Sequence, residues 1–193
     1  MRSRTKDWLG LFAAGTVFGV MSASAQQSDQ TKFLTDAIRA DVAEVRLGEL
    51  AQKQGQSQEV RQYGDMLSKD RTKSMKKASD LAKQLGVPAP TEPSAQQQRQ
   101  YEALSKLSGT EFDTTFMSQM VRGHQEEIAK YSAEAQAGSG SEVTALAKDT
   151  LPTLKMHLEH AQSIQKTASS STHYGRGSDD HSSGPSSSGS SQR

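Results

Sequence analysis

Apolar residues recur at helical spacing, every three or four positions, through four long segments of the chain. This pattern predicts long helices at 30–54, 58–85, 110–137 and 141–167, with a shorter helix at 95–107. The breaks between them are "GQSQ" (55–58), the proline-rich "VPAPTEP" (87–93) and "GSGS" (138–141), none of which favours a helix. Runs of β-branched residues are absent. The chain is therefore predicted to be all-α.

An internal repeat organises these helices. Sliding the chain by 83 residues places 31–60 on 114–143 with seven identities in thirty positions and no gap. Each unit contains one short break, so each is predicted to form an antiparallel helical hairpin. The connection at 86–109 is long enough to cross over. Two hairpins with one long crossover carrying a short extra helix predict a ferritin-like four-helix bundle.

The two ends of the chain differ in composition from this region. A basic start, an apolar run at 8–21 and an A-x-A site ending at Ala25 are typical of a cleaved export signal. The last residues are rich in Ser and Gly and nearly free of aliphatic side chains. We predict a signal peptide at 1–25, the bundle domain at 29–168 and a disordered tail at 169–193.

Charge and cysteine content narrow the functional class. Loss of the leader would take four of the 23 basic and 22 acidic side chains, which leaves 20 and 21 and a net charge of −1. No basic surplus favours nucleic acid as a partner. The chain has no Cys, which excludes disulfides, thiolate chemistry and a lipid-modified cysteine. We expect a soluble periplasmic or secreted protein with no transmembrane span in the mature chain. Any protein partner and the oligomeric state stay open.

Acidic and imidazole side chains fall on the apolar helix faces. Asp41 and Glu44 lie on the apolar face of the first helix, and the repeat aligns them with His124 and Glu127 on the third. A spacing of three places both members of each pair on one side of a helix. His157 lies in the apolar stripe of the last helix.

Two interpretations of these residues remain open. In the first, a divalent metal ion binds a ligand set that consists of Glu44, His124, Glu127 and His157, with Asp41 and Asp70 as further candidates. However, dinuclear carboxylate bundles also use a Glu-x-x-His motif on two helices, and Arg71 and Leu154 occupy that depth here. In the second, Glu44 pairs with Arg71 and Glu127 with a histidine, which forms a satisfied buried polar layer. No cofactor is required by the second.

Three stretches carry a family resemblance: "AEVRLGELA" (43–51), "EFD…M…M…H" (111–124) and "TLPTLKMHL" (150–158). They resemble the bacterial domain-of-unknown-function family 4142, and the resemblance covers nearly all of 31–165. It implies an exported, ferritin-like bundle with no settled activity, in a family often labelled as outer-membrane proteins. Neither a barrel pattern nor a lipid anchor supports that label here. Glu44, His124 and His157 match the family pattern, which usually reads Asp-His where this chain has Asp70-Arg71.

The sequence shows no nucleophile–base pair, no phosphate-binding loop and no complete metal ligand set. The leading hypothesis is therefore a non-enzymatic, exported helical bundle, a stress-related binding or interaction module of the periplasm. The alternative is a ferritin-like metal-binding protein that takes iron, manganese or zinc. A surface protein displayed through its tail is a third hypothesis.

Overall fold

The computed structural model describes the backbone of residues 18–137 and 140–174, and the side chains of 24–137 and 140–167. Within these residues the chain forms α1 (Phe18–Gln54), α2 (Gln58–Gln84), α3 (Ala95–Leu104), α4 (Gly109–Gln136) and α5 (Glu142–Tyr174). The described part of the chain contains no strand. The all-α prediction is confirmed. None of the described helices is long and apolar enough to cross a membrane.

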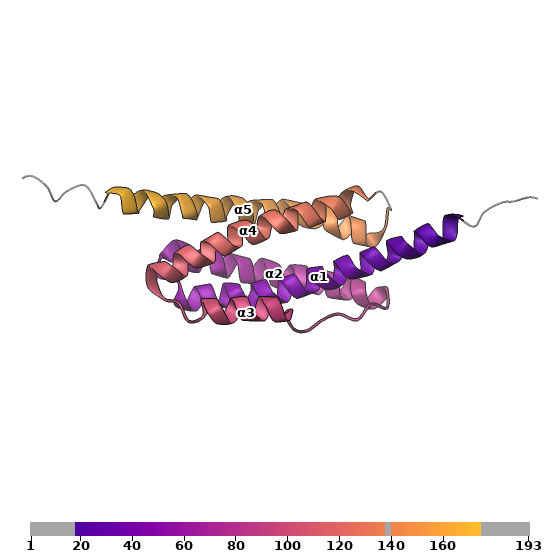
Figure 1. Ribbon diagram of the computed structural model, residues 1–193, viewed down its shortest axis with the longest axis horizontal. Coiled ribbons are helices and arrows are strands. Elements are labelled where there is room, and N and C mark those ends of the chain that lie inside the picture. The colour runs from indigo at the N-terminus through magenta and orange to yellow at the C-terminus, as the bar shows by residue number, and fades with distance from the viewer. Residues whose placement is uncertain (1–17, 138–139, 175–193) are drawn as a thin grey trace, which may run out of the picture.

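The helices form two hairpins that pack side by side (Figure 1). α1 pairs with α2 and α4 with α5, while α1 also packs on α4 and α2 on α5. The segment after α2 returns along the bundle before α4 begins, so α2 and α4 run in the same direction (Figure 1). α3 lies within this segment and packs against α1 and α4. The predicted pair of hairpins with one long crossover and a short extra helix is therefore confirmed.

Two helices extend beyond their predicted bounds. α1 begins at Phe18, inside the predicted leader, and α5 ends at Tyr174, inside the predicted tail. No glycine or proline interrupts 20–47 or 153–174, so nothing in the local sequence stops either helix. The other leader and tail residues lie outside the described residues.

Close backbone contacts at two glycines set the distance between α1 and α2 in the first hairpin. A Cβ added to Gly48 would lie 2.7 Å from the carbonyl oxygen of Gly64, and one added to Gly64 would lie 2.6 Å from that of Gly48. Only glycine permits the backbones of α1 and α2 to approach this closely. The second hairpin is tied to this pair by Asp113, whose carboxylate accepts hydrogen bonds from the backbone N–H groups of Gln56 (2.9 Å) and Ser57 (2.8 Å).

The apolar core has a polar layer across its middle. One apolar cluster includes Leu67, Phe112 and Phe116, and another includes Leu34 and Ile38. Between them, buried charged and imidazole side chains from four helices meet; these are Asp41, Glu44, Arg71, His124, Glu127 and His157. This layer is the candidate site.

Candidate functional site

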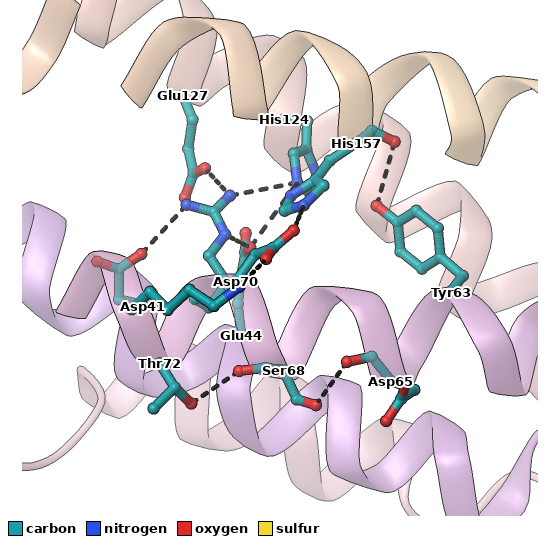
Figure 2. A network of polar contacts seen from close by, with 12 residues as sticks. Asp41, Glu44, Tyr63, Asp65, Ser68, Asp70, Thr72, His124, Glu127 and His157 are labelled. Carbon is teal, nitrogen blue, oxygen red and sulfur yellow. Dashed lines mark hydrogen bonds and ion pairs between the residues drawn. The ribbon is translucent and has the colours of Figure 1, made fainter. Parts of the chain in front are cut away.

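Arg71 of α2 lies at the centre of the polar layer and is only 2% exposed. Its Nη2 donates to Glu127 Oε2 at 2.6 Å, and its Nη1 donates to Asp41 Oδ1 at 3.2 Å. Its Nε lies 2.5 Å from Glu44 Oε2, but the N–H does not point along a hydrogen bond, so this contact is an ion pair. One guanidinium thus joins carboxylates from α1 and α4, that is, from both hairpins. Figure 2 shows the side chains of Asp41, Glu44 and Glu127 converging on this point.

The position of the proton on His124 is fixed by its surroundings. Its Nδ1 lies 2.8 Å from the backbone carbonyl oxygen of Met120, which can only accept, so Nδ1 carries the proton. In the neutral ring Nε2 is then an acceptor, and Arg71 Nη2 donates to it at 3.2 Å. The arrangement favours a neutral His124.

His157 bridges the layer to the edge of the bundle. Its Nδ1 lies 3.4 Å from His124 Nε2, and its Nε2 lies 3.3 Å from Asp70 Oδ2 (Figure 2). A neutral imidazole has a single N–H, so His157 can donate to only one of these two acceptors. Its backbone carbonyl accepts from the Tyr63 hydroxyl at 3.3 Å. Asp70 is partly exposed and also pairs with Lys73.

Burial and charge set the protonation of the layer. Burial raises the pKa of Asp41 to about 6 because lost hydration outweighs the attraction of Arg71. For the same reason the pKa of Glu44 rises well above its ordinary value, and the negative charges of Glu127 and Asp41 raise it further. Burial also opposes ionisation of Glu127, but Arg71 and His124 together hold its pKa below the ordinary value. Burial, followed by the charge of Arg71, lowers the pKa of His124 to about 4. Of the two glutamates, Glu44 therefore takes up a proton more readily than Glu127 does.

A groove reaches this layer from outside. It occupies about 710 Å³ between α1, α3 and α4, and both Glu44 and Glu127 line it. Their side chains are 9% and 12% exposed. The carboxyl pair is therefore reachable from the groove, while Arg71 lies behind it.

The predicted site residues converge, but their partners differ in part from those expected. Glu44 meets Arg71 as the buried-layer interpretation expected. The expectation that Glu127 pairs with a histidine is corrected, because its closest charged partner is Arg71 from the other hairpin. The sequence repeat does not reveal which helix of one hairpin lies next to which helix of the other, so the contact between Arg71 of α2 and Glu127 of α4 was not predicted. The groove was missed as well.

A dinuclear metal centre does not fit these residues. Ligand atoms of Glu44, His124 and Glu127 do lie within 4.8 Å of one another, as a mononuclear site would need. However, the Arg71 guanidinium lies within hydrogen-bond distance of both Glu127 and His124 Nε2, so it already uses the lone pairs that metals would take. A fixed cation there would also repel metal ions.

Comparisons with known proteins define the family. The sequence model described as "Domain of unknown function (DUF4142)" matches residues 17–164, and the chain belongs to this family. No curated protein matches the chain. Among solved structures, the chain is similar to the "DUF305 fragment from Deinococcus radiodurans", with a TM-score of 0.63 and 17% sequence identity over 72% of this chain and 95% of that chain. At this identity the likeness shows the fold alone. The resemblance inferred from the sequence is confirmed.

Proposed function

We propose that this member of the DUF4142 family is an exported, non-enzymatic binding module whose central polar layer is held together by Arg71 and not by a metal ion. The observation that carries the proposal is the contact of one buried guanidinium with three carboxylates, those of Asp41, Glu44 and Glu127. A buried charge cluster of this kind can fix helix register without a cofactor. The groove that ends on two of these carboxyls supports a binding role.

Metal binding is the competing function, since Glu44, His124 and Glu127 present ligand atoms within 4.8 Å. Metal analysis of protein purified without a His-tag, together with melting in the presence and absence of Mn²⁺ or Zn²⁺, separates the two. Under our proposal the purified protein holds no stoichiometric metal and its melting temperature does not change with either ion. A ligand that binds only the folded state would raise that temperature by mass action.

Arg71→His sharpens the test, because it places an imidazole where the family pattern has one. If Arg71 holds the layer, the variant is destabilised and its melting remains insensitive to metal. If the layer is a metal site, the variant gains a ligand and its metal-dependent melting shift exceeds that of the wild type. A variant that is as stable as the wild type without metal would contradict the role given to Arg71.

Export is the second part of the proposal, and the basic start, apolar run and A-x-A site support it. Cell fractionation should place the protein in the periplasm or medium, and N-terminal sequencing should begin at Gln26. Recovery of protein that retains Met1 would contradict it.

A further inference from the structure

The groove between α1, α3 and α4 is lined by side chains of both charges. Four carboxyl groups face three basic side chains; these are Asp36, Glu44, Glu126 and Glu127, with Arg39, Arg122 and Lys130. Arg71 lies directly behind two of the carboxyls. Neither sign of charge dominates the lining, which favours a ligand that is neutral overall.

Three glutamine side chains in the lining are not used by the fold. The carboxamides of Gln96, Gln100 and Gln119 form no hydrogen bond with any described residue. Gln97, by contrast, accepts from the backbone N–H of Ser94 at 2.8 Å in the cap of α3. Each uncommitted carboxamide offers the groove two N–H donors and an acceptor oxygen. The ligand that suits them hydrogen-bonds in both directions.

The hydroxyl of Tyr131 is a further polar group that the fold does not use. Tyr131 is 4% exposed, and its ring packs edge-on against Phe33 with the ring centroids 5.0 Å apart. Its hydroxyl forms no hydrogen bond with any described residue, whereas that of the equally buried Tyr63 donates to the backbone carbonyl of His157. The Tyr131 oxygen is not sealed inside the core, so it opens onto the groove that this residue lines. Because a buried tyrosine hydroxyl usually has a partner, this one indicates a polar group of a ligand in the groove.

Gly123 keeps the groove open on the side of α4. It lies inside this helix, where glycine weakens the helix relative to alanine. A Cβ built on it would meet nothing within 4 Å, and its φ is not positive, so neither packing nor backbone conformation requires glycine here. The repeat aligns it with Ala40 in the opposite wall, which is also small. These two residues leave space for a ligand between α1 and α4.

We propose that the groove binds a neutral carbohydrate, either a small free sugar or the end of a glycan chain, through the Tyr131 hydroxyl and the glutamine carboxamides. This inference rests on the proposed binding function and deepens it by naming the site and the ligand class. Every hydroxyl of a sugar ring both donates and accepts hydrogen bonds, as carboxamides and the Tyr131 hydroxyl do. The charged side chains of the lining add acceptors and donors for the same hydroxyls. The ring of Phe33 also lines the groove and offers an apolar surface for the C–H groups of the sugar.

The size and composition of the groove favour a sugar over other classes of ligand. Its volume of about 710 Å³ is that of a small-molecule site. A charged ligand would meet side chains of its own sign in the lining. A peptide binds by adding to a strand edge or by laying an apolar helix face in an apolar groove. The described part of the chain contains no strand, and charged and amide side chains make up more than half of the lining residues.

Isothermal titration of the purified chain with two disaccharides tests the proposal. Cellobiose has hydroxyls alone, and N,N′-diacetylchitobiose also has the acetamido groups of cell-wall glycans. We expect saturable binding of at least one of them at millimolar concentration, and none of two neutral controls, tetraethylene glycol and trialanine. Tighter binding of N,N′-diacetylchitobiose would assign the groove to a cell-wall glycan, and equal or tighter binding of cellobiose to a free sugar. The proposal is overturned if neither disaccharide saturates, or if either control binds as tightly.

Removal of one hydroxyl locates the ligand. Tyr131→Phe should weaken disaccharide binding by about tenfold, the effect of one lost hydrogen bond. Its melting temperature should stay that of the wild type, because this hydroxyl forms no hydrogen bond with any described residue. Tyr63→Phe is the matched control: its hydroxyl bonds inside the core and does not line the groove, so this variant should bind as the wild type does. Equal binding by Tyr131→Phe and the wild type would contradict the assignment.

A larger side chain in the wall tests the groove itself. Gly123→Leu fills the groove from α4 and should abolish saturation by the disaccharide. Ala129→Leu places the same side chain on an exposed position of α4 outside the groove and should leave binding unchanged. If Gly123→Leu folds poorly, Ala40→Leu blocks the opposite wall. Unchanged binding in a folded wall variant would place the ligand elsewhere and overturn the proposal.

Melting with Zn²⁺ separates this inference from the proposed function. If neither disaccharide binds and Zn²⁺ has no effect, the carbohydrate inference fails while the metal-free layer stands. If Zn²⁺ raises the melting temperature and neither disaccharide binds, both fail. If a disaccharide binds and Zn²⁺ has no effect, both hold.

Discussion

Replacement of Arg71 by leucine tests whether this side chain holds the bundle together. The substitution introduces an apolar side chain of comparable bulk into the core. It leaves Asp41, Glu44 and Glu127 without their shared cation. At an effective dielectric constant near 20, opposite charges about 4 Å apart attract by roughly 4 kcal/mol. Repulsion among the three carboxyls and the desolvation of the guanidinium offset much of the attraction that Arg71 gains from its three partners. Breaking a buried ion pair from one side usually costs about 3–5 kcal/mol, and we expect a loss in this range at pH 7.

The pH dependence of this loss identifies its cause. Without Arg71, burial and mutual repulsion raise the pKa of all three carboxyls in the folded state. A carboxyl whose pKa is raised on folding stabilises the fold below its unfolded value, and this contribution is lost as pH rises through the folded value. The variant should therefore lose less stability at pH 4.5 than at pH 7, because the stranded carboxyls are protonated there.

Urea unfolding of both proteins, followed by circular dichroism at the two pH values, measures the effect. Lys69→Leu removes a cation from an exposed position of the same helix, where it pairs with Asp65, and should change stability by less than about 1 kcal/mol. If Arg71→Leu loses no more than this control, or loses the same amount at both pH values, the role assigned to Arg71 is wrong.

Three further substitutions test other parts of the structure by the same unfolding assay. Gly48→Ala forces a Cβ against the Gly64 carbonyl and should cost on the order of 1–3 kcal/mol, whereas a neutral effect would mean that the hairpin can spread freely. Gly123→Ala adds a methyl group to open space and should stabilise by about 0.5–1 kcal/mol, and destabilisation would show hidden packing there. His124→Gln concerns acid sensitivity: with its pKa lowered to about 4 from 6.5, folded His124 resists protonation, so its contribution is present above pH 6.5 and lost as pH falls toward 4. The variant should lack that loss, on the order of 3 kcal/mol, and an unchanged pH profile would contradict the lowered pKa.

The sequence was informative about the helices because their apolar faces are continuous. Buried residues such as Leu34, Leu67, Phe116 and Leu154 recur at the helical period, so each helix could be located from periodicity alone. Helix ends followed local signals where these exist, as at Gly86, whose φ of 68° stops α2. Where no stop signal exists the bounds were wrong, as at the start of α1.

The site was predictable only as a set of residues. Periodicity and the repeat placed Glu44 and Glu127 at equal depth, but the assignment of their partners requires knowing which helices are neighbours. The contact between Glu127 and Arg71 joins residues from different hairpins, and no local pattern encodes it. The groove depends on the gap between α1 and α4. Its one sequence signal was Gly123, a glycine inside a long helical period, aligned with the small Ala40 in the repeat.

The repeat also suggests why one cation serves both hairpins, and this can be tested. The shift of 83 residues makes Leu154 of α5 the equivalent of Arg71 of α2, and both are buried. Glu44 and Glu127 are equivalent too, so the two hairpins are related by an approximate twofold axis. An arginine at position 154 should therefore reach the same two carboxyls from the opposite side of this axis.

Leu154→Arg alone adds a second buried guanidinium and should destabilise the protein, as Arg71→Leu does. The double variant has one guanidinium and one leucine in the layer, as the wild type does. It should therefore recover at least half of the stability that the two single variants lose together. A double-mutant cycle by urea unfolding measures this coupling. Leu151→Arg, one turn earlier in α5, combined with Arg71→Leu is the matched control and should show no recovery. If the effects of Arg71→Leu and Leu154→Arg simply add, the polar layer depends on the particular path of the Arg71 side chain and not on a cation at the twofold axis.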